Sequence, residues 1–136
     1  MRVVLDTNVF SSSFFGGNPR AVIDLWKTGR LTLCLSQEIL DEYVEVLRRL
    51  GLDSTPELDE LLTFFATGSH ILFTIRTPEV RVVTDPDDDR FIACALALKA
   101  AYIVTGDKAL LDVRHCQGLE VVTPRAFLDM MGDPAP

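Results

Sequence analysis

Four acidic residues lie in segments that are far apart in the sequence. Asp6 directly follows a short apolar run, and Asp107 comes three residues after another. Glu42 lies in a predicted helix, and Asp89 closes the run Asp85-Pro86-Asp87-Asp88-Asp89. Carboxylate oxygens suit hard cations such as Mg²⁺ or Mn²⁺. Two such ions stabilise the attacking and leaving oxygens of a phosphodiester displacement. Brought together, these acids would support metal-dependent hydrolysis of phosphodiesters.

Each acid also has an ordinary structural explanation. Asp6 and Asp107 are good helix N-caps or Asx-turn residues, and acids favour the N-terminus of a helix, as in the run 85–89. One or two acids would suffice for capping, however, and like charges about 4 Å apart repel by roughly 1 kcal/mol in water and more at a semi-buried site. Four carboxylates within five residues therefore indicate a cation nearby.

Glu42 is the acid of its predicted helix that lies closest to the apolar face. At about 100° per residue, one stripe is formed by Ile39, Tyr43, Val46, Leu47 and Leu50. Glu42 lies at the edge of this stripe, where it can lean toward the sheet. The other acids face water, where pairing with Arg48 or Arg49 explains them: Glu38, Asp41 and Glu45.

Strand-like and helix-like segments alternate along the chain. The strands are expected at 3–5, 31–35, 71–75, 102–104 and 119–122, with a weaker candidate at 80–83. The helices are expected from an Asn18-Pro19 cap to Gly29, from Ser36 to Leu50, over 57–66, over 88–99, after Asp107 and after Thr123-Pro124. This alternation predicts a parallel α/β sheet, whose sites form at the carboxyl ends of the strands. Asp6 and Asp107 should therefore emerge at the same edge.

Composition narrows the class of protein. The 136 residues are 48% hydrophobic and 24% charged, which is typical of one globular domain. We expect no membrane span, because the longest apolar run is the eight residues from Phe91 to Leu98, and no signal peptide, because Asp6 interrupts the first run. Three cysteines without paired spacing make a reducing cytoplasm the expected location. The net charge of −7 argues against nucleic-acid binding through charge alone, without offsetting metal ions.

Four motifs in order resemble those of PIN domains. They are Asp6-Thr7-Asn8 after the first strand, Glu42 in the helix that Ser36 begins, Asp89-x-x-Ile92-Ala93, and Val104-Thr105-Gly106-Asp107. The acidic run 85–89 and the ending Thr123-Pro124-Arg125-x-Phe127-Leu128 look like a bacterial subgroup of toxin components. The resemblance covers essentially the whole chain, to about Met131.

The resemblance implies a fold and an activity. The fold would be a Rossmann-like, three-layer α/β/α domain over residues 1–131, with a five-stranded parallel sheet and a flexible tail at 132–136. The activity would be that of an Mg²⁺- or Mn²⁺-dependent endoribonuclease acting on RNA. Many relatives are toxins that a small antitoxin neutralises, and many dimerise, so an antitoxin protein and a second copy are the expected protein partners.

The resemblance also implies roles for individual residues. The catalytic, metal-binding acids would be Asp6, Glu42, Asp89 and Asp107, with Asn8 and Thr105 as supporting polar residues. Asp88 is adjacent to Asp89, so either could be the ligand. Phosphate contacts would fall to a few cations near the same edge: Arg20, Arg90 or Lys108.

Other readings stay open at this stage. A receiver-like signalling domain is also α/β with acids at strand ends, but it places its paired acids after the first strand. A haloacid-dehalogenase-type phosphatase needs Asp-x-Asp where this chain has Asp6-Thr7-Asn8. A PIN-like fold without activity would serve as an interaction partner. Phosphate-binding glycine loops and the serine-hydrolase motif are absent from the sequence.

Overall fold

The computed structural model describes residues 1–132 of the chain. The strands are β1 (Arg2–Leu5), β2 (Thr32–Ser36), β3 (Ile71–Thr74), β4 (Tyr102–Val104), β5 (His115–Cys116) and β6 (Leu119–Val122). The α-helices are α1 (Thr7–Ser12), α2 (Gly17–Lys27), α3 (Gln37–Arg49), α4 (Pro56–Thr67), α5 (Asp89–Ala97), α6 (Lys108–Leu111) and α7 (Pro124–Met131). Two short 3₁₀ helices are η1 (Ser13–Phe15) and η2 (Pro86–Asp88).

The strands form one sheet in the order β3-β2-β1-β4-β6-β5 within the described residues. The first five of these are mutually parallel, which confirms the predicted α/β fold with a five-stranded parallel sheet. The sixth strand, β5, was not predicted. It pairs antiparallel with β6 across the turn Gln117-Gly118, where both residues have positive φ (49° and 86°). Two residues are too short a segment to show strand periodicity in a sequence.

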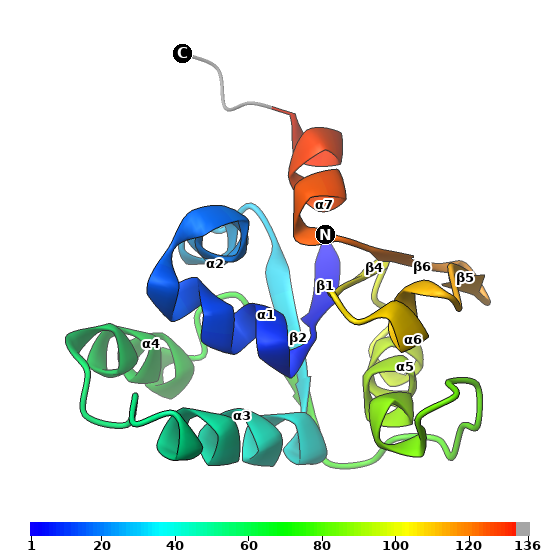
Figure 1. Cartoon of the computed structure of the whole chain (residues 1–136), viewed down its shortest axis with the longest axis horizontal. Coiled ribbons are helices and arrows are strands. Elements are labelled where there is room, and N and C mark those ends of the chain that lie inside the picture. Colours follow the sequence, from blue (N-terminus) through cyan, green and yellow to red (C-terminus); the bar gives the residue numbers. More distant parts are fainter. Residues whose placement is uncertain (133–136) are drawn as a thin grey trace.

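Helices cover the sheet from both sides. Figure 1 shows α1, α2 and α4 to one side of β1 and β2, and α5 to the other. This arrangement follows from right-handed crossovers, because the chain moves outward from β1 to β3 and then returns to β4. The central strands are therefore covered on both faces, and Val3, Val4 and Ile103 are fully buried. α7 packs against α2.

Several helices begin where the sequence predicts. The hydroxyl of Ser36 accepts a hydrogen bond from the backbone N–H of Ile39 at 3.2 Å, and α3 follows directly. Thr123 caps α7 in the same way, accepting from Ala126 N at 3.1 Å. Each cap satisfies a backbone N–H that has no partner inside the helix.

Other boundaries correct the sequence-based expectations. Helix α1 was not predicted; it buries Val9 and Phe10 between Asp6 and η1. Helix α2 begins at Gly17 rather than after an Asn18 cap, because Gly16, at φ 95°, makes the turn from η1. The last predicted helix before β4 is shorter at both ends, since residues 86–88 form η2 and the helix ends at Ala97.

The candidate strand at 80–83 is wrong. The backbone N–H groups of Val82 and Val83 both donate to Asp89 Oδ1, at 2.9 and 2.8 Å, instead of to a neighbouring strand. At the other end of the chain, Gly132 follows α7 as its C-cap. Most of the predicted flexible tail, residues 133–136, lies outside the described residues.

Candidate functional site

Asp6 lies at the carboxyl end of β1, next to the carboxyl end of β4. Its backbone N–H donates to Val104 O at 3.0 Å, which continues the parallel pairing by one residue. Its side chain is buried, with 4% of the residue exposed, and Oδ2 accepts a hydrogen bond from Thr105 Oγ1 at 2.6 Å. Burial raises the pKa of Asp6, although the bonds from Thr105 and from the backbone of Asn8 oppose the rise. Asp107 and Glu42 add negative charge in the same direction.

Thr105 joins Asp6 to the loop that carries Asp107. Its buried hydroxyl accepts the backbone N–H of Asp107 at 2.9 Å while it donates to Asp6. Asp107 in turn caps α6, because its Oδ1 accepts from Ala109 N at 3.1 Å. The structural explanation for Asp107 thus holds, and its carboxyl group still lies close enough to Asp6 to affect the pKa of that residue.

The two neighbouring aspartates Asp88 and Asp89 point their carboxyl groups to different partners. Asp89 Oδ1 receives the two backbone N–H groups of Val82 and Val83 and so fixes the preceding loop. Asp88 instead interacts with Asp107 and lies near Asp6. Burial, the contact with Asp107 and the surrounding negative charge raise the pKa of Asp88 to about 7.

Asp88 has one buried oxygen without a protein donor. Its Oδ2 has no hydrogen-bond partner within residues 1–132. Two ionised carboxylates repel each other and have no donor between them, so Asp88 and Asp107 need either a shared proton or a cation. An unpaired buried carboxylate oxygen is costly in a folded protein. The carboxyl end of β4 therefore presents an acidic cluster that is not neutralised from within.

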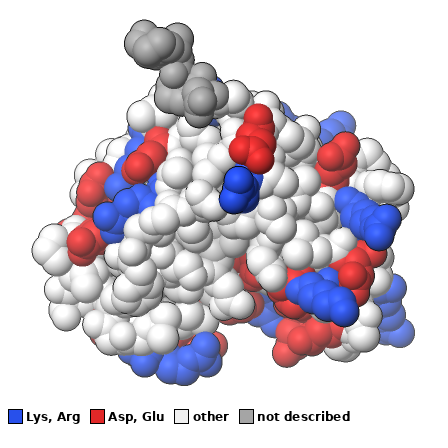
Figure 2. Space-filling model, turned by 45° about the horizontal axis from the view of Figure 1, so that its top comes forward, with Lys and Arg blue, Asp and Glu red and all other residues white. Residues whose placement is uncertain are grey.

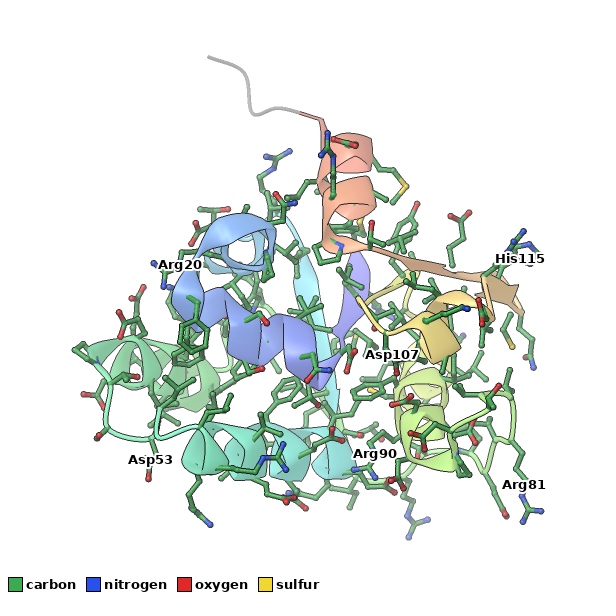
Figure 3. The ribbon with its side chains drawn as sticks, viewed as in Figure 1. Arg20, Asp53, Arg81, Arg90, Asp107 and His115 are labelled. Carbon is green, nitrogen blue, oxygen red and sulfur yellow. The ribbon has the colours of Figure 1, made fainter. Side chains whose placement is uncertain are left out.

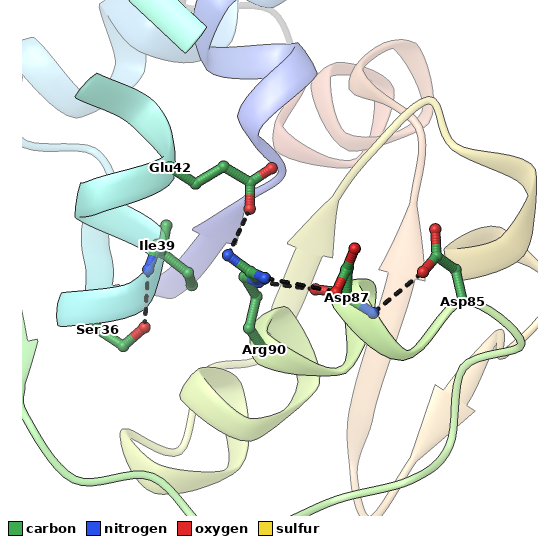
Figure 4. Close-up of polar contacts among 6 residues, drawn as sticks. All are labelled: Ser36, Ile39, Glu42, Asp85, Asp87 and Arg90. Atoms are coloured by element: carbon green, nitrogen blue, oxygen red, sulfur yellow. Dashed lines mark hydrogen bonds and ion pairs between the residues drawn. The ribbon is translucent and has the colours of Figure 1, made fainter. Parts of the chain in front are cut away.

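Glu42 reaches this region from α3. The next residue, Tyr43, is buried; its ring stacks on Phe10 with 4.2 Å between centroids, and its hydroxyl donates to Leu5 O. This bond fixes α3 against the end of β1 and brings Glu42 near Asp6. Glu42 Oε2 is itself 3.0 Å from Arg90 Nη1, the ion pair that Figure 4 shows between α3 and α5.

The other acids of α3 do not share this position. Glu38, Asp41 and Glu45 are exposed, as their places on the predicted helix indicate, and Glu42 is half-buried. Tyr43 has a positioning role that the sequence did not predict. Its place in the apolar stripe was visible, but its hydroxyl contact with Leu5 joins residues 38 positions apart.

The three predicted cations are placed differently from one another. Arg20 donates from its guanidinium to Ser13 O and Phe14 O, both at 2.9 Å, and Figure 3 places it far from Asp107. Lys108 is exposed beside Asp107, and Arg90 contacts Glu42. On the face drawn in Figure 2, Lys and Arg side chains are interspersed with Asp and Glu.

Comparison with known families decides the class of protein. The sequence pattern described as the PIN domain matches residues 2–109, from β1 to the start of α6. The chain belongs to the PIN domain family. No curated protein and no solved structure gives a significant match to it. PIN domains are generally nucleases, and those nucleases typically use divalent metal ions.

The donor set of this PIN domain fits such an ion in chemistry. The candidate ligands are all carboxylates, which suit Mg²⁺ or Mn²⁺, and the unpartnered Asp88 Oδ2 is an oxygen that a cation would satisfy. Within residues 1–132, no three His, Cys, Asp or Glu side chains are already arranged to hold a metal ion. Metal binding therefore requires these side chains to come closer together, and Glu42 and Asp107 each have one oxygen engaged, with Arg90 and with the N-terminus of α6.

The helices were also compared with the length and hydropathy that a membrane span requires. Within residues 1–132, the PIN domain contains no helix that is both long enough and apolar enough to cross a membrane.

Proposed function

We propose that this PIN domain is an Mg²⁺- or Mn²⁺-dependent endoribonuclease that hydrolyses RNA phosphodiester bonds. The observation that carries the proposal is the grouping of Asp6, Asp88 and Asp107 beside the carboxyl ends of β1 and β4, where burial and the neighbouring acids raise the pKa of Asp88 to about 7. Clustered carboxylates repel one another, and a bound cation would remove this repulsion, so the cluster indicates a cation-binding site. The family match supports nuclease chemistry over the receiver-like and phosphatase readings.

We assign the metal-binding role to Asp6, Glu42, Asp88 and Asp107. Asp88 takes the place that Asp89 had in the motif-based assignment, because Asp88 interacts with Asp107 and lies near Asp6, whereas Asp89 Oδ1 receives two backbone N–H groups of the preceding loop. Thr105 holds the Asp6 carboxylate in one orientation through its 2.6 Å hydrogen bond. Asn8 supports the same carboxylate through its backbone N–H.

When bound, divalent cations supply charge neutralisation of the phosphate and activation of water. The protein supplies the remaining requirements. Asp6 and Thr105 are buried and held rigidly, because both lie at the ends of central strands. Glu42 comes from α3 and Asp88 from η2, and both add carboxylates to this pair of strand ends.

The decisive test is cleavage of an RNA pool that contains single-stranded and structured molecules. Wild type is compared with Asp6→Asn in Mg²⁺, in Mn²⁺ and in EDTA. We expect cleavage that requires the metal and that falls by about 100-fold or more in the variant, since a ligand that stabilises charge by several kcal/mol is lost. Asp53→Asn is the matched control, because Asp53 is exposed between α3 and α4, far from Asp107 (Figure 3).

The outcomes of this cleavage assay distinguish a nuclease from a PIN domain that acts as an interaction partner. Folded Asp6→Asn protein without cleavage, beside an active Asp53→Asn variant, supports the nuclease. Equal cleavage by wild type and Asp6→Asn contradicts the assignment of Asp6. A folded wild type that binds Mn²⁺ and cuts no RNA in the pool favours a PIN domain that acts as an interaction partner.

The proposal extends to a toxin role in a type II toxin–antitoxin pair. Its support is the resemblance of the run 85–89 and of the segment 123–128 to toxin components. A small antitoxin protein would then block the site, and the PIN domain would form homodimers. Induced expression should arrest bacterial growth, and Asp6→Asn should abolish the arrest. Light scattering of the purified protein measures the dimer.

A further inference from the structure

Arg90 places a positive charge beside Glu42, one of the four acids assigned to the metal site. The residue belongs to the first turn of α5, and its side chain spans the space between α5 and α3. Nη1 lies 3.0 Å from Glu42 Oε2, and Nε donates to Asp87 O at 2.7 Å. The second terminal nitrogen, Nη2, lies 3.8 Å from Asp87 Oδ1, which is a looser contact to a side chain that is 87% exposed. Arg90 is therefore anchored at Nε, while its outer nitrogens rest on carboxylates.

This ion pair conflicts with metal binding by Glu42. Arginine stays protonated at every ordinary pH, so the guanidinium leaves Glu42 only by moving. A divalent cation that binds Glu42 Oε2, alone or together with Oε1, must displace the guanidinium. The Glu42 and Arg90 side chains are 28% and 26% exposed, which leaves them room to separate.

A cavity beside the pair can receive the displaced group. It measures about 220 Å³ and is lined by Glu42, Glu45, Val46, Arg49, Asp87 and Arg90. Arg49 and Arg90 thus border an open space that Glu42 also lines. Guanidinium groups bind phosphate oxygens in pairs, and arginine is the preferred residue where that geometry matters.

We infer that Arg90 is exchanged between two anions: it holds Glu42 while the metal is absent, and it binds a backbone phosphate of the RNA once the metal has taken Glu42. This inference rests on the proposed function. The exchange makes metal binding and RNA binding cooperative, because the metal frees the Arg90 guanidinium from Glu42 and the RNA phosphate then binds it. Linkage requires the coupling to be equal in both directions.

The first measurement is Mn²⁺ affinity without RNA, by calorimetry. Arg90→Gln should bind Mn²⁺ about 2- to 5-fold more tightly than wild type, since the cation no longer competes with a half-exposed ion pair. Arg81→Gln is the matched control, because Arg81 also forms a carboxylate pair, with Glu79 at 2.9 Å, on the exposed loop before η2. Its Mn²⁺ affinity should equal that of wild type.

The second measurement is binding of a labelled single-stranded 2′-O-methyl RNA, whose integrity is checked on a gel. In wild type, Mn²⁺ should tighten RNA binding. In Arg90→Gln, RNA binding in the presence of Mn²⁺ should be about 5- to 10-fold weaker, since a charge-assisted phosphate contact is lost. Arg81→Gln should again match wild type.

Each result either supports or overturns the inference. Tighter Mn²⁺ binding together with weaker RNA binding in Arg90→Gln supports it. Unchanged or weaker Mn²⁺ binding overturns it, and so does unchanged RNA binding. Melting in EDTA checks that the variant folds; if it does not, Arg90→Met, which keeps the apolar stem, carries the same two measurements.

The inference can fail without the proposed function. A wild type that binds Mn²⁺ and cleaves RNA, beside an Arg90→Gln variant with both affinities unchanged, overturns only the role of Arg90. A folded wild type that neither binds Mn²⁺ nor cleaves RNA overturns the proposed nuclease, and the exchange of Arg90 with it.

Discussion

Thr105 and Asp6 are joined by a 2.6 Å hydrogen bond that links the ends of strands β4 and β1. The threonine hydroxyl has one proton, and it is directed to Asp6 because the backbone N–H of Asp107 occupies the oxygen from the other side. The Thr105 hydroxyl therefore orients the Asp6 carboxylate, and the backbone N–H of Asp107 orients that hydroxyl.

Replacing Thr105 by valine tests whether the threonine hydroxyl positions the Asp6 carboxylate. Valine has nearly the same shape but no hydroxyl, so Asp6 loses its donor and the N–H of Asp107 loses its acceptor. We expect unfolding free energy to fall by about 1–3 kcal/mol and Mn²⁺ affinity by about 10-fold. Thr105→Ser, which keeps the hydroxyl, is the control. Equal Mn²⁺ affinity in the valine and serine variants would contradict the positioning role.

The neighbouring aspartates Asp88 and Asp89 should respond differently to the same change. Asp88→Asn should lose Mn²⁺ binding and cleavage, with stability retained or increased, because an acid leaves a repulsive cluster. Asp89→Asn should keep both activities, since the amide oxygen still accepts from Val82 and Val83. Calorimetry and the RNA cleavage assay measure the difference.

Asp89→Ala tests the structural half of that assignment. The alanine leaves two backbone N–H groups without their acceptor, and we expect a loss of about 2–4 kcal/mol in unfolding free energy. Chemical denaturation measures the loss. If Asp89→Asn loses Mn²⁺ binding while Asp88→Asn retains it, the two residues have been assigned in the wrong order.

The metal-free protein should lose stability as pH rises through neutrality. The pKa of Asp88 is raised from its ordinary value of 3.8 to about 7, so the folded state holds this proton more tightly than the unfolded chain. The resulting stabilisation is complete below pH 4 and is lost as the pH approaches and passes 7. Between pH 4 and pH 7 wild type therefore loses this stabilisation progressively, so in EDTA the melting temperature of Asp88→Asn should exceed that of wild type by more at pH 8 than at pH 5. A difference that does not change with pH would refute the raised pKa.

Tyr43 offers a test of how α3 is positioned. Tyr43→Phe removes the hydroxyl that donates to Leu5 O, directly before Asp6. We expect a loss of about 1–2 kcal/mol in unfolding free energy, because a buried carbonyl loses its donor, and weaker Mn²⁺ binding, because Glu42 is held less closely to Asp6. Tyr102→Phe is the matched control, since Tyr102 is half-buried in β4 and packs its ring edge-on against Phe127. A Tyr43→Phe variant with wild-type Mn²⁺ affinity would limit the role of Tyr43 to stability.

The features of this protein that depend on residues close together in the sequence could be predicted from the sequence alone. Apolar runs predicted the five parallel strands, and Ser36 and Thr123 marked the helices that follow them, because a cap acts within three residues of itself. Asp6 and Asp107 could be placed at one edge of the sheet because parallel strands share a direction. The helical period separated Glu42 from the exposed acids of α3.

What depends on distant contacts was decided only by the tertiary structure. Asp88 and Asp89 are residues of the same type and are adjacent in the sequence. They differ in the groups that their carboxyl groups contact: Asp88 contacts Asp107, and Asp89 contacts the backbone of Val82 and Val83. The pairing of Arg90 with Glu42 likewise joins two helices whose distance no local pattern encodes. Local propensity is written in the order of residues, whereas the partner of a charged group is set by how helices pack on the sheet.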